Sequence, residues 1–353
     1  MSEEELLQLV VPYSNSEDFA TDLNKVLKEK GAAVVTGVLS ESECAKFAEL
    51  KQQELASESP QGGKMVHAQG EIAWKARLHP KVRGTFARIY GTAELSVSID
   101  MPSMFYTPVG TPATFENEQW LHVDQNTNTG VVHNCYQGIL YVQASSGEAS
   151  STTVVWPESH LDSVYGRVMS DLDAVERAQW KDDSGIPAGH FVSLNNLKNS
   201  DTRAQLLSEC TVKAKRVPVP AGALLLWDSR TVHQGWSAGQ RFAVPVCWEP
   251  RERVSRSATA RKLFMAAIGV ASSHSPSEGR VHPAASTRRG PHVRLRWPAV
   301  RPYAALPEEE LTKADWEKLW EKWSEDEFVE DVVGLADAIA LASVLRPEVA
   351  FAL

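Results

Sequence analysis

Two histidines and one aspartate have the types and spacing needed for a metal centre. His122 and Asp124 lie two residues apart in QWLHVDQ, a run with the composition of a β-strand. Because successive side chains of a strand point to opposite faces, these two project from the same face. His233 follows another strand-like run and lies 109 residues after Asp124. Two imidazoles and one carboxylate suit a ferrous ion and leave three of its positions open. An H-x-D tripeptide alone is common, and its ordinary interpretation is a strand whose polar residues face water.

A cation follows the second histidine at a useful distance. Arg241 lies eight residues after His233, where the next strand is expected. A buried guanidinium near a metal is suited to hold the far carboxylate of a dicarboxylate cosubstrate.

The elements that must position these residues are short strands. Segments rich in Val, Ile, Thr and aromatic residues are separated by Gly, Pro and Ser, with no helix between most pairs. This pattern predicts an antiparallel barrel or jelly roll. The segments are ELSVSIDMPSMFYT, QWLHVDQ, GVVHNCYQGILYVQ, STTVVW, CTVKAKRVPV, GALLLWDS and RFAVPVCWE.

Helical patterns flank this core and interrupt it once. Residues 17–31 have helical spacing and end at a glycine, and Ser40 with Glu43 forms a capping box that predicts a new helix. We therefore expect one α+β domain over residues 1–353. Its predicted parts are a helical region (1–95), a core (96–250) with a helical insertion (161–209), and a basic segment with C-terminal helices (251–353).

Four motifs, in this order along the chain, resemble those of the phytanoyl-CoA dioxygenase-like branch of the iron(II)/2-oxoglutarate dioxygenases. GAAVVTGVLSESECAKF resembles the N-terminal strand and helix of that family, and QWLHVDQ resembles its W-H-x-D segment. TTVVWPESHL resembles its P-G-S-H turn, with Glu158 in place of the glycine. VPAGALLLWDSRTVHQG resembles the strand that leads to the distal metal histidine. The resemblance covers roughly residues 30–250.

The resemblance implies a double-stranded β-helix and a set of site residues. Iron(II) is bound by His122, Asp124 and His233, and Arg241 anchors 2-oxoglutarate, with Gln137 as a further cosubstrate contact. The implied reaction uses O2, releases succinate and CO2, and oxidises a C–H bond of a small molecule. Asp124 stands where a halogenase of this superfamily would carry Gly or Ala, so hydroxylation or a related oxidation is favoured.

Two other functions are compatible with parts of the sequence. A jelly-roll protein without catalysis would keep the fold and bind ligands only. GWSAG, with Ser237 at its centre, matches the nucleophile elbow of serine hydrolases. That motif requires a helix directly after the serine, whereas a β-like run containing Pro245 follows here. His160 is expected to satisfy backbone groups at a turn.

Composition limits the partners. The chain has 353 residues, a net charge of −9 and four cysteines without a CxxC pair, which is typical of a soluble protein of a reducing cytoplasm. No apolar run is long enough to span a membrane, and the net charge argues against nucleic acid. Residues 251–301 hold 11 Lys and Arg against two Glu. This segment is either a solvated surface or a contact for an anionic substrate. We expect a monomer or homodimer.

Overall fold

The computed structural model divides into two compact units. The first unit comprises Met1–Ala45, Gln61–Lys64 and Met104–Ala243, and the second comprises Lys46–Pro60, Met65–Ser103 and Val244–Leu353. The described residues are 1–56, 69–100, 103–105, 120–125, 135–145, 150–171, 192–236, 238–255, 258–259, 262–263, 266, 271–272, 274–277 and 351–353.

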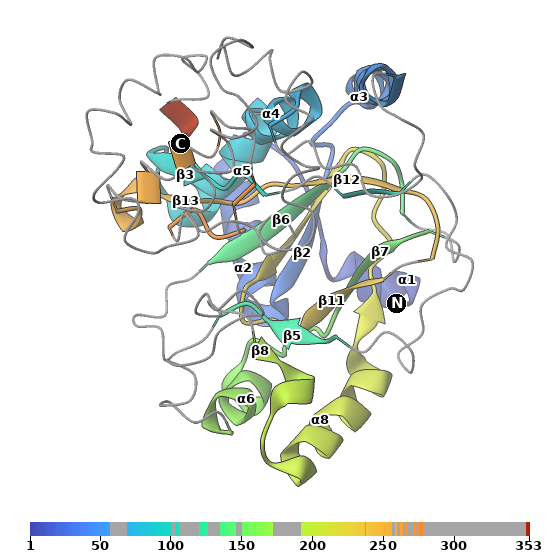
Figure 1. The fold of residues 1–353 in the computed structure, drawn as a ribbon, viewed down its shortest axis with the longest axis vertical. Helices are drawn as coiled ribbons and strands as arrows, with labels where there is room; N and C mark the ends of the chain where they lie inside the picture. Colours follow the sequence, from blue (N-terminus) through green and yellow to red (C-terminus); the bar gives the residue numbers. More distant parts are fainter. Residues whose placement is uncertain are drawn as a thin grey trace, which may run out of the picture. The chain divides into compact units, whose positions relative to one another are not determined.

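A six-stranded sheet forms one layer of the first unit. Its strand order is β1-β2-β10-β6-β12-β4, with β1 parallel to β2 and β10 antiparallel to both of its neighbours. The long strands β2 and β6 cross the middle of Figure 1. The bounds are β1 Val10–Pro12, β2 Ala32–Thr36, β4 Ser103–Phe105, β6 Tyr136–Tyr141, β10 Ala223–Asp228 and β12 Arg241–Pro245.

A five-stranded sheet forms the second layer and carries both candidate histidines. Its order is β8-β5-β11-β7-β9, and the pairs are antiparallel. The bounds are β5 His122–Val123, β7 Thr152–Val155, β8 Val192–Ser193, β9 Lys215–Arg216 and β11 His233–Trp236.

The two sheets face each other across a buried layer. Tyr141, Leu225 and Trp227 of the first sheet pack in one cluster with Val155 of the second. The hydroxyls of Tyr141 and Thr153 lie 3.0 Å apart and join the two sheets by a hydrogen bond. Mixed helix and largely antiparallel sheet agree with the expected α+β class. Closure of these strands into a double-stranded β-helix stays a prediction, as does the single-domain division.

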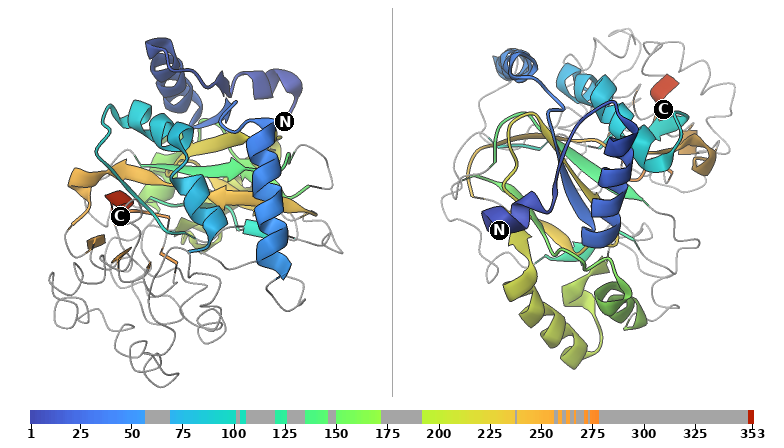
Figure 2. Two further views of the ribbon diagram at one scale, coloured as in Figure 1. Left: turned by 90° about the horizontal axis from the view of Figure 1, so that it is seen from above. Right: turned by 180° about the vertical axis from the view of Figure 1, so that it is seen from behind.

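Two of the N-terminal helices have an end that the sequence predicts. Helix α1 (Glu3–Leu7) precedes β1, and α2 (Glu17–Lys30) packs against β1 and β2, as Figure 2 shows. Helix α2 ends at Gly31, which has a left-handed φ of 74°. The backbone N–H of Ser40 donates to Glu43 and that of Glu43 donates to Ser40, which confirms the capping box of α3 (Glu41–Ala56).

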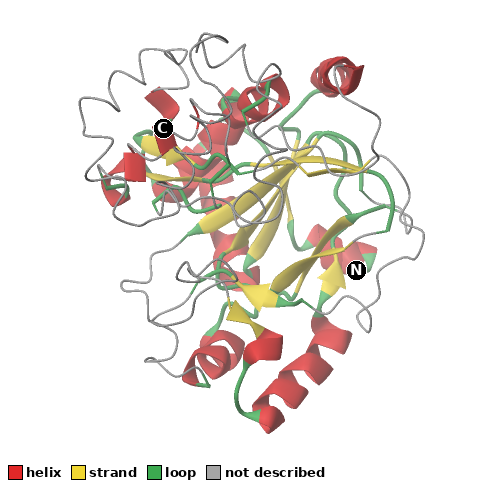
Figure 3. Ribbon diagram, viewed as in Figure 1, coloured by secondary structure: helices red, strands yellow, loops and turns green. Residues whose placement is uncertain are grey.

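Helices of the expected insertion cover the outer face of the five-stranded sheet. Helices α6 and α8 lie beside β5 and β8 in Figure 3, and Leu206 and Cys210 of α8 share a core cluster with Leu121, Val123 and Val154. The elements are η2 Asp162–Gly166, α6 Arg167–Ser170, η3 Leu194–Asn196 and α8 Ser200–Lys213.

The prediction of one strand, over CTVKAKRVPV, is wrong for most of its length. CTVK, the start of the segment CTVKAKRVPV, forms the last turn of α8, and only Lys215 and Arg216 pair as a strand. Asn199 caps the helix by accepting from the backbone N–H groups of Asp201 and Thr202. Leu206 and Cys210, one helical turn apart, are buried. A capped helix with a buried face outweighs the β preference of Thr211 and Val212.

The second unit contains helices and a two-stranded sheet. Strands β3 and β13 pair antiparallel, and the last residues of the chain contact this unit, since Ser96 donates to the carbonyl of Leu353. The expected C-terminal helices lie outside the described residues. Within the described part of the chain, no helix is long and apolar enough to cross a membrane. The elements are α4 Glu71–Arg77, α5 Pro80–Tyr90, β3 Leu95–Val97, β13 Trp248–Pro250 and η4 Arg251–Arg253.

Candidate metal centre

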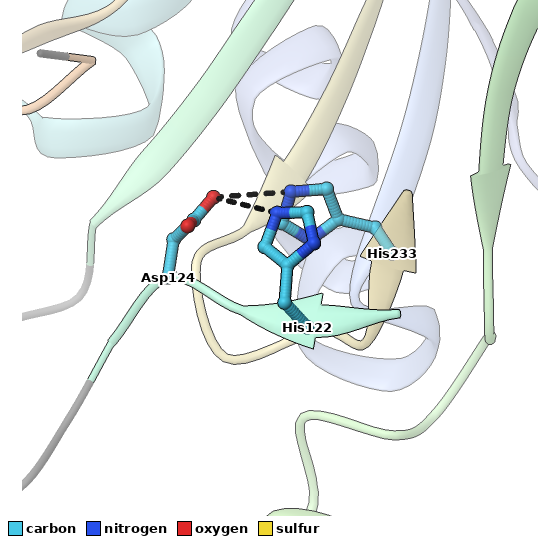
Figure 4. Close-up of side chains that lie close together, drawn as sticks. All are labelled: His122, Asp124 and His233. Atoms are coloured by element: carbon cyan, nitrogen blue, oxygen red, sulfur yellow. Dashed lines mark ion pairs between the residues drawn. The ribbon is translucent and has the colours of Figure 1, made fainter. Parts of the chain in front are cut away.

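The three candidate ligands meet inside the first unit. His122 of β5 and His233 of β11 are directly opposite each other in an antiparallel pair, and Asp124 follows β5 at its end. Leu121 and Val123 point to the other face, into the cluster with α8, which confirms the alternation predicted from the sequence. Figure 4 shows both rings turned toward the carboxylate.

The distances suit a shared ion. Oδ2 of Asp124 lies 3.1 Å from Nε2 of His233 and 3.6 Å from Nε2 of His122. One donor atom from each residue lies within 4.8 Å of the others, and the three residues are 4–7% exposed. A group this close and this buried can surround one metal ion.

Backbone contacts set the tautomer of both rings. Nδ1 of His122 lies 2.8 Å from the carbonyl oxygen of Trp120, and Nδ1 of His233 lies 2.9 Å from that of Thr231. A carbonyl only accepts, so each Nδ1 carries the proton and donates it. When such a ring is neutral, its Nε2 carries a lone pair that points toward Asp124 and the other ring. This is the arrangement of metal-binding histidines. Burial, and after it the charge of His233, lowers the pKa of His122 and favours its neutral form, although Asp124 acts in the opposite direction.

Gln137 acts on the carboxylate. Its side-chain amide donates to Oδ2 of Asp124 over 2.7 Å, and it is 5% exposed on β6. The backbone N–H of Asp124 donates to the carbonyl oxygen of Ser229, which fixes the residue from a second side. Gln137 therefore holds Asp124 in place. A contact between Gln137 and a cosubstrate stays a prediction.

The loop before His233 is fixed by residues that the sequence analysis did not identify. The hydroxyl of Thr231 donates to the carbonyl of Gly31, and the backbone N–H of Asp228 donates to the same oxygen. Asp228, which is 1% exposed, accepts from the backbone and guanidinium of Arg230. The bond from the hydroxyl of Thr231 thus fixes this residue, whose own backbone carbonyl accepts from Nδ1 of His233 and orients the ring. The sequence signal for this contact is Gly31, which also ends helix α2.

Arg241 is a buried cation between the two sheets. It is 8% exposed, and its guanidinium donates to the hydroxyls of Tyr141 (3.1 Å) and Thr153 (3.4 Å). Its Nε has no hydrogen-bond partner, and within the described residues no carboxylate pairs with it. Buried charges are normally paired, so this guanidinium fits an anionic ligand.

The other candidate residues lie elsewhere. Nε2 of His160 lies 2.9 Å from the carbonyl of Lys28, in agreement with the turn role expected for it. Ser237 lies outside the described residues, but the chain enters strand β12 at Arg241 where a nucleophile elbow requires a helix. Trp236 packs against the cluster on the outer face of β11, beneath the guanidinium of Arg216.

Comparison with known proteins finds distant likenesses. No family model matches the chain. The Ava biosynthesis cluster protein O of Aspergillus versicolor is 24% identical over 216 residues, which are 58% of this chain and 63% of that protein. The chain therefore aligns with less than two thirds of this relative's length.

Similar solved structures include non-heme, 2-oxoglutarate-dependent enzymes. The epimerase SnoN, in complex with Fe3+, alpha ketoglutarate and nogalamycin RO, has a TM-score of 0.43 and 14% identity over 66% of this chain and 84% of that one. The carbocyclase SnoK of nogalamycin biosynthesis has a TM-score of 0.40 and 18% identity, and the match covers 64% of this chain and 81% of that one. HygX of Streptomyces hygroscopicus, with nickel and 2-oxoglutarate bound, has a TM-score of 0.41 and 13% identity, and the match covers 64% of this chain and 85% of that one. At these values the likeness carries no argument about activity, which rests on the site itself.

Proposed function

We propose that this chain is an iron(II)- and 2-oxoglutarate-dependent oxygenase that oxidises a C–H bond of a small molecule. The observation that carries the proposal is the buried cluster in which His122 and His233 turn Nε2 toward one oxygen of Asp124. Nε2 of each ring and Oδ2 of Asp124, three atoms that can each offer a lone pair, converge in a buried site. Such an arrangement is costly unless a cation lies among them.

The donor set favours iron among the common metals. Two imidazoles and one carboxylate that leave several positions open are the ligand set of non-heme iron(II) oxygenases. His122, Asp124 and His233 would hold the ion, and Gln137 would keep the carboxylate oriented. When bound, iron(II) with 2-oxoglutarate and O2 supplies an oxidative decarboxylation that yields succinate and CO2 and oxidises the substrate.

Arg241 supports the choice of cosubstrate. A dicarboxylate with one end at the metal needs a cation for its other end, and a guanidinium binds a carboxylate well. Arg241 lies on the inner side of the sheets, because its partner Thr153 is cross-strand from Gly235, two residues after His233. Tyr141 and Thr153 orient the guanidinium from one side and leave its Nε unpaired.

The test is an anaerobic titration of the full chain. We expect iron(II), and then 2-oxoglutarate, to raise the melting temperature, because each binds only the folded state. His122→Ala removes one ligand and should abolish both increases. Arg241→Leu should keep the response to iron(II) and lose most of the response to 2-oxoglutarate. On admission of O2, the native chain should release succinate.

Controls separate this proposal from its alternatives. His79→Ala changes a histidine of the second unit, at the N-cap position of α5, which is not one of the three candidate ligands, and should respond as the native chain does. Binding of both ligands without any succinate would show a binding protein instead. Labelling of Ser237 by a fluorophosphonate, with no response to iron(II), would show a hydrolase.

A further inference from the structure

An exposed aromatic side chain lies directly against the candidate metal centre. Trp120 is 46% exposed, and its ring is stacked on that of His122, with 4.8 Å between the ring centroids and 21° between the planes. Trp120 precedes His122 by two residues, so both side chains lie on the inner side of the strand. The indole is thus the neighbour of a metal ligand on a side that solvent reaches.

The opposite strand leaves room for this indole. His122 pairs with His233, so in the antiparallel register Trp120 lies opposite Gly235. A Cβ placed on Gly235 would lie 3.1 Å from Cζ2 of Trp120, closer than side chains normally pack. Gly235 has no left-handed φ, so its missing side chain matters here for space.

The backbone at Trp120 is fixed as well. Its N–H donates to the side-chain oxygen of Gln234, a residue that is 0% exposed on β11. One face of the indole rests on His122 and one edge lies against Gly235, and 46% of Trp120 stays exposed. A single exposed apolar residue is common on proteins. An exposed residue held this closely beside a metal ligand needs a further reason.

We infer that Trp120 is the binding platform for the substrate, and that the substrate carries a flat, conjugated ring. The inference rests on the proposed function, since the platform serves the metal at His122. A ring that stacks on the other face of the indole extends the existing stack of His122 and Trp120, and a group carried by that ring is the part of the substrate that reaches toward the metal. A flat ring also covers more of the indole than a compact ammonium group does.

The experiment measures whether a flat probe approaches the metal. The full chain is loaded with Mn(II) and 2-oxoglutarate without O2, and the proton relaxation of 2-naphthalenemethanol is recorded. Its saturated counterpart, decahydro-2-naphthalenemethanol, has the same skeleton but is not flat. The chain loaded with Zn(II), which is not paramagnetic, gives the background.

We expect Mn(II) to enhance relaxation of the flat probe and to affect the saturated probe far less. Trp120→Ala should weaken binding of the flat probe by about threefold to tenfold, the usual range for an aromatic pair. Trp120→Phe keeps a ring and should retain most of the binding. Gly235→Ala should weaken binding of the flat probe by displacing the indole, while Trp120 and His122 themselves are not substituted. Trp236→Phe, a tryptophan on the outer face of β11, is the matched control and should change nothing.

Binding of Mn(II) and 2-oxoglutarate is titrated in the same samples. If neither binds, the proposed function fails. If both bind but Trp120→Ala leaves the flat probe unaffected, Trp120 merely shields His122 and the platform is wrong. Equal binding of the two skeletons, or tighter binding of tetramethylammonium, would overturn the flat-ring substrate.

Discussion

At the scale of single residues, orientation of Asp124 is the property most open to test. Gln137 donates to the same oxygen that both histidines face. Gln137→Leu removes that donor while keeping a similar volume. Groups that orient metal ligands commonly contribute 10- to 100-fold to metal affinity, so we expect a loss of about that size. Titration with Mn(II) measures it, with Gln143→Leu, an exposed glutamine just after β6, as the control. Equal affinities for the two variants would contradict this role.

Part of the candidate cluster could be predicted from the sequence, and its supporting contacts could not. The two-residue period of a strand places His122 and Asp124 together without knowledge of the fold. The cross-strand pairing of His122 with His233 depends on register, which the local sequence does not specify. The same holds for Gln137, whose contact with Asp124 requires β6 to lie across from the end of β5.

At the scale of elements, the end of α2 and the loop before His233 depend on one glycine. Gly31 has a φ of 74°, and a Cβ there would lie 2.5 Å from Nδ1 of His160 and 2.7 Å from the hydroxyl of Thr231. Gly37 has a φ of 72° with no atom within 4 Å. Alanine at Gly37 therefore tests backbone strain alone, at about 1 kcal/mol. Gly31→Ala adds a steric clash and should cost at least about 2 kcal/mol.

Denaturant unfolding of the two variants checks this difference. Gly31→Ala should also weaken Mn(II) binding, because Thr231 holds the carbonyl that orients His233. Gly37→Ala should leave metal affinity unchanged. If the two variants lose equal stability and both bind Mn(II) normally, the loop is not braced through Gly31.

Local signals predict elements well where they agree and poorly where they compete. The capping box at Ser40 and the glycine at Gly31 mark real helix ends. In CTVKAKRVPV the β-branched residues favour a strand, but they follow a capped helix whose buried face continues to Cys210. That face is formed by tertiary packing with Leu121 and Val123, which lie more than 80 residues away in sequence, in a segment predicted to be another strand.

At the scale of the whole molecule, most of the basic segment lies outside the described residues. Arg251 and Arg253, at its start, contact their own unit: Arg251 donates to the carbonyl of Leu95, and Arg253 lies over the ring of Tyr90. An anionic substrate contact by this segment stays a prediction. Charge along a sequence shows where bases are concentrated, but not which of them bind the protein's own backbone.

A lysine of the same segment makes the stability of the second unit depend on pH. Lys262 is 0% exposed and donates to the hydroxyl of Ser96 and the carbonyl of Val97. Burial lowers its pKa to about 7, although Glu249 acts in the opposite direction. The unfolded chain, with a lysine pKa near 10.4, binds more protons than the folded one between about pH 7 and pH 10. Stability due to this group therefore rises with pH over that window.

Lys262→Met removes this contribution and keeps a long apolar stem. Below about pH 7 the native chain buries a charged ammonium, so the variant should melt at a higher temperature there. Because other groups titrate in the same range, the informative quantity is the difference in melting temperature between variant and native chain. That difference should shrink as pH rises from 7 toward 10, because Lys262 then loses its proton in the folded chain and no longer buries a charge.

Lys75→Met, which changes a half-exposed lysine of α4, should show no such trend. A constant difference for Lys262→Met would mean that Lys262 keeps its charge throughout, stabilised by Glu249 and its two oxygen partners.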